Sequence, residues 1–164
     1  MQLKNLKHYT VFILLICCFS FIQIDEKVKD NNKYEVTFYS VNNASAILFR
    51  SGSDARFIAD STLLFDNDKL QFHIKNNWWK ENLINIKKTK TNEMTKVDGN
   101  YVFVWRGKTF FFYRKDFKNE LVEKLDVDFL IIQHNVWIEK DFIDKNISYK
   151  HIIVDGTNRW KTRN

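Results

Sequence analysis

The sequence lacks the residues on which several common kinds of site and chain depend. It has no proline and only 4 glycines among 164 residues, which excludes proline-rich linkers, collagen-like repeats and glycine-rich phosphate loops. Its two cysteines, Cys17 and Cys18, are adjacent in an apolar run. Because a disulfide joins separated residues that face each other, the pair builds neither a disulfide framework nor a zinc site. Both are expected to be small, buried apolar residues.

Local catalytic and metal-binding motifs are also absent. The four histidines are His8, His73, His134 and His151, none of them two or four residues apart, and the motifs HxHxDH, HExxH and GxSxG do not occur. A hydrolytic zinc site needs three protein ligands and an open position, and no local signature supplies them. The sequence therefore predicts no catalytic residue, no metal and no other cofactor, and it favours a protein that is not an enzyme.

The chain is rich in apolar side chains and in positive charge. A hydrophobic fraction of 45% and an aromatic fraction of 16% are sufficient for the core of one domain and exclude disorder over most of the length. Lysine and arginine number 26 against 20 acidic residues, which gives a net charge of +6. This excess suits an anionic partner such as nucleic acid or lipid headgroups, but an ordinary solvated surface can also carry it.

The first 27 residues have the pattern of an export segment. Lys4 and Lys7 precede the apolar run Val11–Ile24, and Asp25 follows it. The pattern predicts a membrane anchor or uncleaved signal over residues 1–27; a cleaved signal and a buried core helix are the alternatives. As an anchor, residues 9–26 would cross the cytoplasmic membrane once and leave the rest of the chain on its outer side.

The body of the chain, residues 33–164, predicts an α+β domain that begins with strands. Apolar residues alternate with polar ones up to Asp60, and the turn cluster 51–54 splits them, which predicts an antiparallel β meander. A helix is predicted over 66–80, because apolar residues recur every four positions after a capping residue, Asp66 or Asn67. The recurring residues are Leu70, Ile74 and Trp78.

The second half predicts a hairpin followed by a βαβ unit. Two aromatic runs flank Arg106-Gly107, a two-residue turn containing glycine, which is a strong hairpin signal. The last third alternates strand, helix and strand, as a βαβ unit does. The predicted elements are a short strand within 82–96, hairpin strands 101–105 and 108–114, a helix over 116–124, buried strands 127–132 and 151–156, a helix over 138–144, and a further helix starting near the end of the chain.

One segment combines lysines with two adjacent tryptophans. Lysines that neutralise phosphates, beside exposed rings that stack on bases, are the requirement for binding single strands. The alternative is a solvated lysine face with Trp78 in the core. The residues predicted to contact single- or double-stranded DNA are Lys75, Trp79, Lys80, Lys87, Lys88, Lys90, Arg159 and Lys161.

Three polar residues at or just beyond the ends of predicted strands are candidates for a site at the rim of a sheet. Asp60 and Asp155 each end a strand, and His134 lies just beyond another. The carboxyl ends of strands are where α/β folds place functional groups, and two carboxylates in different environments can act as acid and base. In the alternative reading the aspartates cap the turns that follow them, and His134 is a loop residue facing water.

Two blocks of sequence resemble a known family. They are KYEVTFYSVNNASAILFRSGSDARFIADS with the DNDKLQFHI helix after it, and VDFLIIQHNVWIEKDFIDKNISYKHIIVDGTNRWK. The blocks are similar to the opening and closing parts of the carboxy-terminal region of ComEC-type competence proteins, the membrane channels of bacterial DNA uptake. The resemblance runs from about Lys33 to the end of the chain.

The resemblance implies a metallo-β-lactamase-like fold in a degenerate form. Asp60 answers to the aspartate that ends the family's first strand pairs, and His134 to a metal-binding histidine. The HxHxDH motif is missing, and the space between the blocks is too short for a whole hydrolase domain. The missing channel-forming spans and the early stop imply a detached or truncated piece of the channel.

Three functional hypotheses follow. The first is a non-catalytic, membrane-anchored domain outside the cytoplasmic membrane that contacts DNA or other competence and membrane proteins. The second is a metal-dependent nuclease or hydrolase of metallo-β-lactamase type that uses Asp60, His134 and Asp155. The third is a structural exported domain or a gene remnant without independent activity.

Overall fold

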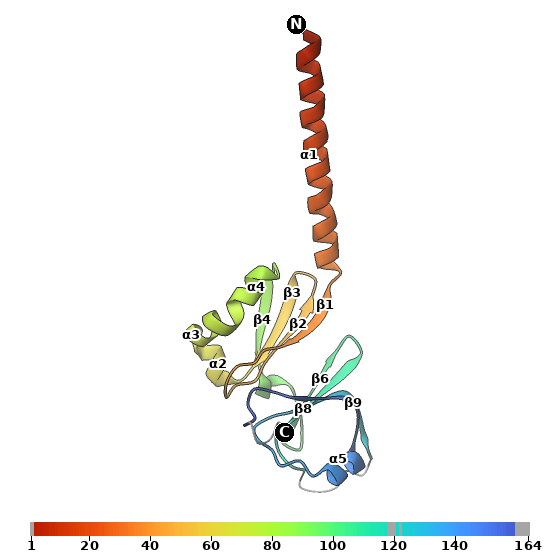
Figure 1. Cartoon of the computed structure of the whole chain (residues 1–164). Helices are drawn as coiled ribbons and strands as arrows, with labels where there is room; N and C mark the ends of the chain where they lie inside the picture. The colour runs from red at the N-terminus through yellow and green to blue at the C-terminus, as the bar shows by residue number, and fades with distance from the viewer. Residues whose placement is uncertain (1, 118–120, 122, 160–164) are drawn as a thin grey trace.

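The computed structural model describes residues 2–117, 121 and 123–159, and side chains from His8 onward. A single long helix, α1 (Gln2–Asn31), extends away from a body of two β-sheets and short helices (Figure 1). The α+β class predicted from the sequence is confirmed. The further helix predicted to start near the end of the chain falls largely on residues 160–164, outside the described part.

Helix α1 carries the apolar run on its surface. Its side chains from Val11 to Ile24 are exposed, for example Phe21 at 72%, and so are Cys17 and Cys18, contrary to the predicted burial. Among the described residues, no helix has both the length and the apolar character needed to cross a membrane. The membrane span predicted over residues 9–26 is not supported, since the apolar run is shorter than the ~20 residues that a span requires.

The carboxyl end of α1 is fixed to the body by a buried arginine. Arg50, 1% exposed, donates through Nε to the carbonyl of Gly52 at 2.8 Å and pairs with Asp30 and with Glu81. Gly52 has a φ of +65°, and a Cβ there would lie 2.7 Å from the carbonyl oxygen of Asn31. The turn after Ser51 therefore requires glycine where α1 meets the sheet.

The first sheet contains four strands in the order β1-β2-β3-β4. Strands β1 to β3 form the predicted antiparallel meander, and β4 is the short strand expected after the helix; it pairs parallel to β3. The strands are β1 (Tyr34–Phe38), β2 (Ala46–Ser51), β3 (Asp54–Ala59) and β4 (Asn85–Lys90).

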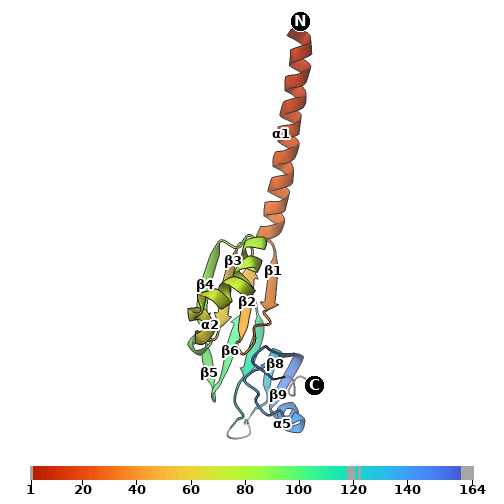
Figure 2. The same cartoon turned by 60° about the vertical axis from the view of Figure 1, so that its left-hand side comes forward.

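Short helices between β3 and β4 cover the outer face of this sheet (Figure 2). They are α2 (Ser61–Phe65), α3 (Asn67–Leu70), a π-helical turn (Gln71–Lys75) and α4 (Asn76–Lys80). The predicted helix 66–80 is confirmed, with Asp66 as its cap: the Asp66 carboxylate accepts from the Lys69 N–H at 3.0 Å. Its recurring apolar residues are buried: Leu70, Ile74 and Trp78.

The second sheet has five strands in sequence order. The predicted hairpin is confirmed, with both turn residues, Arg106 and Gly107, at positive φ as its tight turn requires. The βαβ unit is confirmed too, because β8 and β9 are parallel neighbours joined through α5. The elements are β5 (Thr95–Val97), β6 (Asn100–Trp105), β7 (Lys108–Tyr113), β8 (Leu125–Ile132), α5 (Lys140–Asn146) and β9 (Ile147–Val154), with a 3₁₀ turn (Thr91–Glu93) before them.

Two element predictions differ from the structure. Strand β9 is not buried on both faces, because it lies at the edge of its sheet and Ile152 is 49% exposed. The described residues of the predicted helix 116–124 are not helical; residues 118–120 and 122 lie outside the described part. The Asp116 carboxylate accepts a hydrogen bond from the Tyr113 hydroxyl at 2.9 Å.

The two sheets pack face to face. Phe49 and Ile58 of the first sheet and Phe110 and Ile131 of the second meet in a common apolar core. A second core lies between the first sheet and helices α2 to α4, and a third between the second sheet and α5. Because side chains alternate along each strand, every second residue of β3 and β4 faces the opposite sheet. This alternation positions the candidate sites.

Candidate nucleic-acid interface

The pleat of β4 places two of the lysines predicted to bind DNA on opposite faces of the first sheet. Lys87 is opposite Arg56 in the parallel register, and Lys88 is opposite Phe57. Phe57 belongs to the core beneath the helices, so Lys88 stands on the helix side of the sheet and Lys87 on the side facing the second sheet. Consecutive lysines in the sequence therefore do not form one surface.

The remaining predicted contacts are distributed over different parts of the molecule. Trp79 is 64% exposed on α4 beside the exposed Lys80, with Lys75 one turn earlier, whereas Trp78 is in the core as the alternative reading expected. The Lys90 ammonium lies 5.2 Å from the Phe65 ring centroid. Exposed Arg159 follows β9, where its N–H donates to Asn135, and Lys161 lies outside the described residues.

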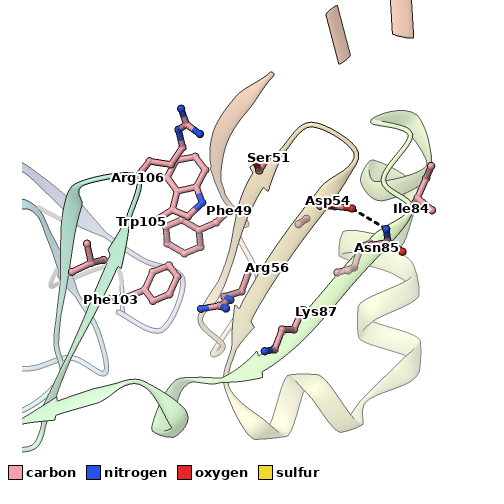
Figure 3. A pocket seen from close by; sticks show the side chains of 13 residues that line it. Phe49, Ser51, Asp54, Arg56, Ile84, Asn85, Lys87, Phe103, Trp105 and Arg106 are labelled. Carbon is pink, nitrogen blue, oxygen red and sulfur yellow. Dashed lines mark hydrogen bonds between the residues drawn. The ribbon is translucent and has the colours of Figure 1, made fainter. Parts of the chain in front are cut away.

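A basic cleft opens between the two sheets beside Lys87 (Figure 3). It has a volume of about 830 Å³, within the range of small-ligand sites. β2, β3 and β4 supply one wall, and the end of β6 with its turn supplies the other. Three cationic side chains line it: Arg56, Lys87 and Arg106. We define these three residues, together with Phe103 and Trp105, as the intersheet cleft.

Aromatic rings form the far wall of the intersheet cleft. Phe49 packs edge-on against Phe103, with ring centroids 4.7 Å apart, and lies 5.6 Å from Trp105. Phe103 and Trp105 remain partly exposed. The Arg56 guanidinium lies 5.4 Å from the Phe103 centroid, and that of Arg106 lies 3.5 Å from the Tyr34 centroid. The guanidinium groups therefore rest on rings, a favourable arrangement for arginine.

The charges of the intersheet cleft are not matched within the described residues. No described carboxylate forms an ion pair with Arg56, Lys87 or Arg106. The one acidic side chain in the lining, Asp54, accepts a hydrogen bond from the Asn85 amide at 2.9 Å. The cleft is therefore net positive. The sequence reading missed Arg56 and Arg106; strand alternation and the hairpin turn were the signals that could have indicated them.

The rim candidates lie at the opposite end of β3 and form a paired network. Asp60 accepts from the Arg114 guanidinium at 2.9 Å and from the Ser45 N–H at 2.9 Å, and His134 Nε2 lies 3.8 Å from its carboxylate and contacts Arg114. Burial alone would raise the pKa of Asp60, but His134, the Ser45 N–H and the Arg114 charge together hold it below its usual value.

Asp155 belongs to the same network, but through an intermediary. The buried Gln133 amide donates to Asp155 at 2.7 Å and to the Ser45 hydroxyl at 2.5 Å. Asp155 also accepts from the Thr157 N–H at 2.9 Å, as the capping alternative expected. The Thr157 hydroxyl in turn accepts from the backbone N–H of His134, which has a φ of +58°.

This network does not form a metal-ligand set within the described residues. No cluster of three His, Cys, Asp or Glu side chains there is placed to hold a metal ion. Asp60 and His134 lie close together, but the Asp60 carboxylate is paired with the Arg114 guanidinium. Asp155 is connected to this pair through hydrogen bonds of Gln133 and Ser45. The arrangement joins the ends of β3, β8 and β9 to one another and does not favour the nuclease hypothesis.

Comparison with known proteins decides the family. A family model of the ComEC C-terminal domain matches residues 36–164. The chain belongs to the ComEC C-terminal domain family. No curated protein and no solved structure matches it.

The ComEC match covers both sheets except the first two residues of β1, and it includes the intersheet cleft and the described rim network. It confirms the resemblance found in the sequence and relates the chain to competence and DNA uptake. The metallo-β-lactamase-like fold implied by that resemblance stays a prediction. In this ComEC-type domain, the intersheet cleft combines an open volume with three basic side chains that have no acidic partner among the described residues.

Proposed function

We propose that this ComEC-type domain contacts DNA during uptake through the unmatched basic side chains of β3 and β4, without catalysing a reaction itself. One observation carries the proposal: Arg56 and Lys87 are register neighbours that face an open cleft without an acidic partner among the described residues. Cations held in this way are available to replace the counterions of a phosphate backbone.

The alternative use of the lysines is protection of the sheet edge. β4 is one of the two edge strands of the first sheet, and lysine on an edge strand opposes pairing with other chains. That role accounts for Lys88 and Lys90, which stand at the edge on the helix side. It does not account for Arg56, because β3 is an inner strand of the sheet.

The test is a titration of DNA binding against salt for the full chain in a mild non-ionic detergent. A labelled oligonucleotide is expected to bind at low salt, with an affinity that falls steeply as salt rises and does not respond to Zn²⁺ or Mn²⁺. Absence of binding at low salt would contradict the proposal. Cleavage that depends on added metal would support the nuclease hypothesis instead.

We further propose that α1 attaches the domain to the membrane proteins of the uptake machinery. From Val11 to Ile24 the helix is apolar except for Ser20 and Gln23, and its large side chains are exposed around it. A helix that is apolar all round needs an apolar surrounding. Association with other helices supplies one without requiring α1 to cross the bilayer alone.

Fractionation tests this attachment. The full chain expressed with its membrane partners is expected to sediment with membranes, and replacing Ile13, Leu14 and Ile16 by Ser should release it. A soluble wild-type chain in the presence of those partners would contradict the proposal. The outer-side location predicted from the sequence is tested in the same cells by protease accessibility of the body.

A further inference from the structure

We infer that the intersheet cleft is a binding site for single-stranded nucleic acid, with phosphates on Arg56, Lys87 and Arg106 and a base on the Phe103–Trp105 wall. This inference rests on the proposed DNA contact and specifies its substrate class. It combines three observations: an open volume of about 830 Å³, three cations without acidic partners among the described residues, and partly exposed aromatic rings.

The cationic side chains can contact phosphate without breaking an existing ion pair. An arginine that rests on an aromatic ring keeps its N–H donors free for a planar anion, whereas one held by a carboxylate does not. Arg56 and Arg106 rest on Phe103 and Tyr34. Lys87 stands beside Arg56 across the β3–β4 pair, so two cations follow one another along the cleft wall (Figure 3).

The aromatic wall selects single strands over duplexes. The faces of bases in a duplex are stacked on one another, and only an unpaired strand presents them to a protein ring. Phe103 and Trp105 are neighbours on the same face of β6, and packing against Phe49 holds them in place. A platform already fixed by the core binds a base with little further loss of conformational freedom.

The position of the cleft suits a strand that passes along the domain. It lies at the end of the first sheet where α1 joins the body, because Ile84 lines both the intersheet cleft and a smaller cavity. The residues of α1 that line this second cavity are Gln23, Glu26, Lys27, Asp30 and Asn31. The residues that line the cleft come from β4 on one side and from the end of β6 and its turn on the other (Figure 3). A long polymer can therefore enter it without unfolding of either sheet.

The experiment measures the affinity of the full chain in mild detergent for labelled dT12, for a duplex of equal length and for a poly-glutamate peptide. We expect dT12 to bind at least tenfold more tightly than the duplex. The double variant Arg56→Ala/Lys87→Ala should lose about tenfold in dT12 affinity and reduce the salt slope by about 1.4, or about 0.7 for each lost phosphate contact. Lys88→Ala, one residue away on the other face, is the matched control and should lose less than twofold.

Trp105 provides an independent readout of stacking. Binding of dT12 should quench tryptophan fluorescence, and Trp105→Leu should remove that quenching and lower the affinity by about tenfold, as expected for the loss of one base–ring stack. Trp105→Phe, which keeps a ring in the same core position, should retain most of the affinity. Its circular dichroism and that of the Leu variant establish that both remain folded.

Each outcome separates the cleft from the wider proposal. Equal affinity for both DNA forms, with Lys88→Ala as damaging as the double variant, would leave DNA contact standing and overturn the single-strand cleft. Binding of poly-glutamate in preference to dT12 would make the cleft a peptide site and overturn the inference. Failure of any DNA to bind at low salt would overturn both.

Discussion

The charged groups at the two ends of β3 differ in whether they have a partner of opposite charge. At its start, Asp54 leads into a cleft where Arg56, Lys87 and Arg106 have no acidic partners among the described residues. At its end, the Asp60 carboxylate is matched by Arg114 and lies beside His134. Matched and buried polar groups contribute to the stability of a fold, whereas unmatched cations beside an open volume are available to a ligand. This difference is the basis of our proposal that the rim network supports the fold and that the intersheet cleft binds a ligand.

The largest expected effect is on the rim. Asp155→Ala should lower the free energy of unfolding by about 3 kcal/mol, because the Gln133 amide and the Thr157 N–H lose their acceptor while remaining buried. Urea denaturation measures this effect. Asp54→Ala, at the exposed start of β3, is the control and should change the same quantity by less than about 0.5 kcal/mol. Equal effects at the two ends would remove the distinction between them.

Acid should weaken the rim network through the Asp60 carboxylate. The folded-state pKa of Asp60 is lowered, so its contribution to stability is present above the unfolded value of about 3.9 and is lost as the pH falls through the folded value. Asp60→Asn should therefore show a smaller loss of stability than the wild type when the pH is lowered from 5 toward 2, as measured by urea denaturation. Parallel pH profiles would show that the Asp60 charge is not engaged in solution.

A smaller effect should appear in the cleft when its acidic lining residue is neutralised. Asp54→Asn removes the one carboxylate among the cleft-lining side chains, so the affinity for dT12 should rise about two- to threefold at low salt, and the gain should disappear at high salt. Fluorescence anisotropy at two salt concentrations measures it. Unchanged affinity would show that the strand does not pass near the start of β3.

The smallest effect should be on the stability of the cleft variants. Lys87→Ala should leave the free energy of unfolding within about 0.5 kcal/mol of the wild type, because this exposed side chain has no ion pair with a described carboxylate. Arg56→Ala should cost at most about 1 kcal/mol, the value of its contact with Phe103. A loss as large as that of Asp155→Ala would mean that the cleft cations support the fold.

Strand and helix patterns in the sequence were sufficient for most of the architecture. The meander, the capped helix with Leu70, Ile74 and Trp78, the hairpin and the βαβ unit were all predicted, because each depends on spacing within a short segment. Burial of β9 was predicted wrongly, since an apolar run does not distinguish an inner strand from an edge strand. The exposure of Cys17 and Cys18 was missed because α1 does not pack against the body over this segment.

The candidate site shows the same limit. Lys87 was found from its lysine-rich neighbourhood, but Lys88 was grouped with it although the pleat turns the two to opposite faces. Arg56 and Arg106 lie 19 or more positions away from Lys87 in the sequence, and neither belongs to the lysine-rich segment that drew attention to Lys87. Asp60 and His134 were predicted to lie at one rim of a sheet. The structure adds Arg114, whose guanidinium forms an ion pair with the Asp60 carboxylate.

The order of residues was sufficient to predict most of the local elements, because these depend on nearby residues, and two extended blocks of similarity were sufficient to predict the family. The partners of the charged side chains could not be predicted in this way, because they depend on how the two sheets pack. Packing of the two sheets brings Arg114 to Asp60 at one end of β3 and leaves Arg56 and Lys87 without a described acidic partner at the other. Electrostatic pairing depends on distance in space, and the distances between segments far apart in the chain are set by how the sheets pack.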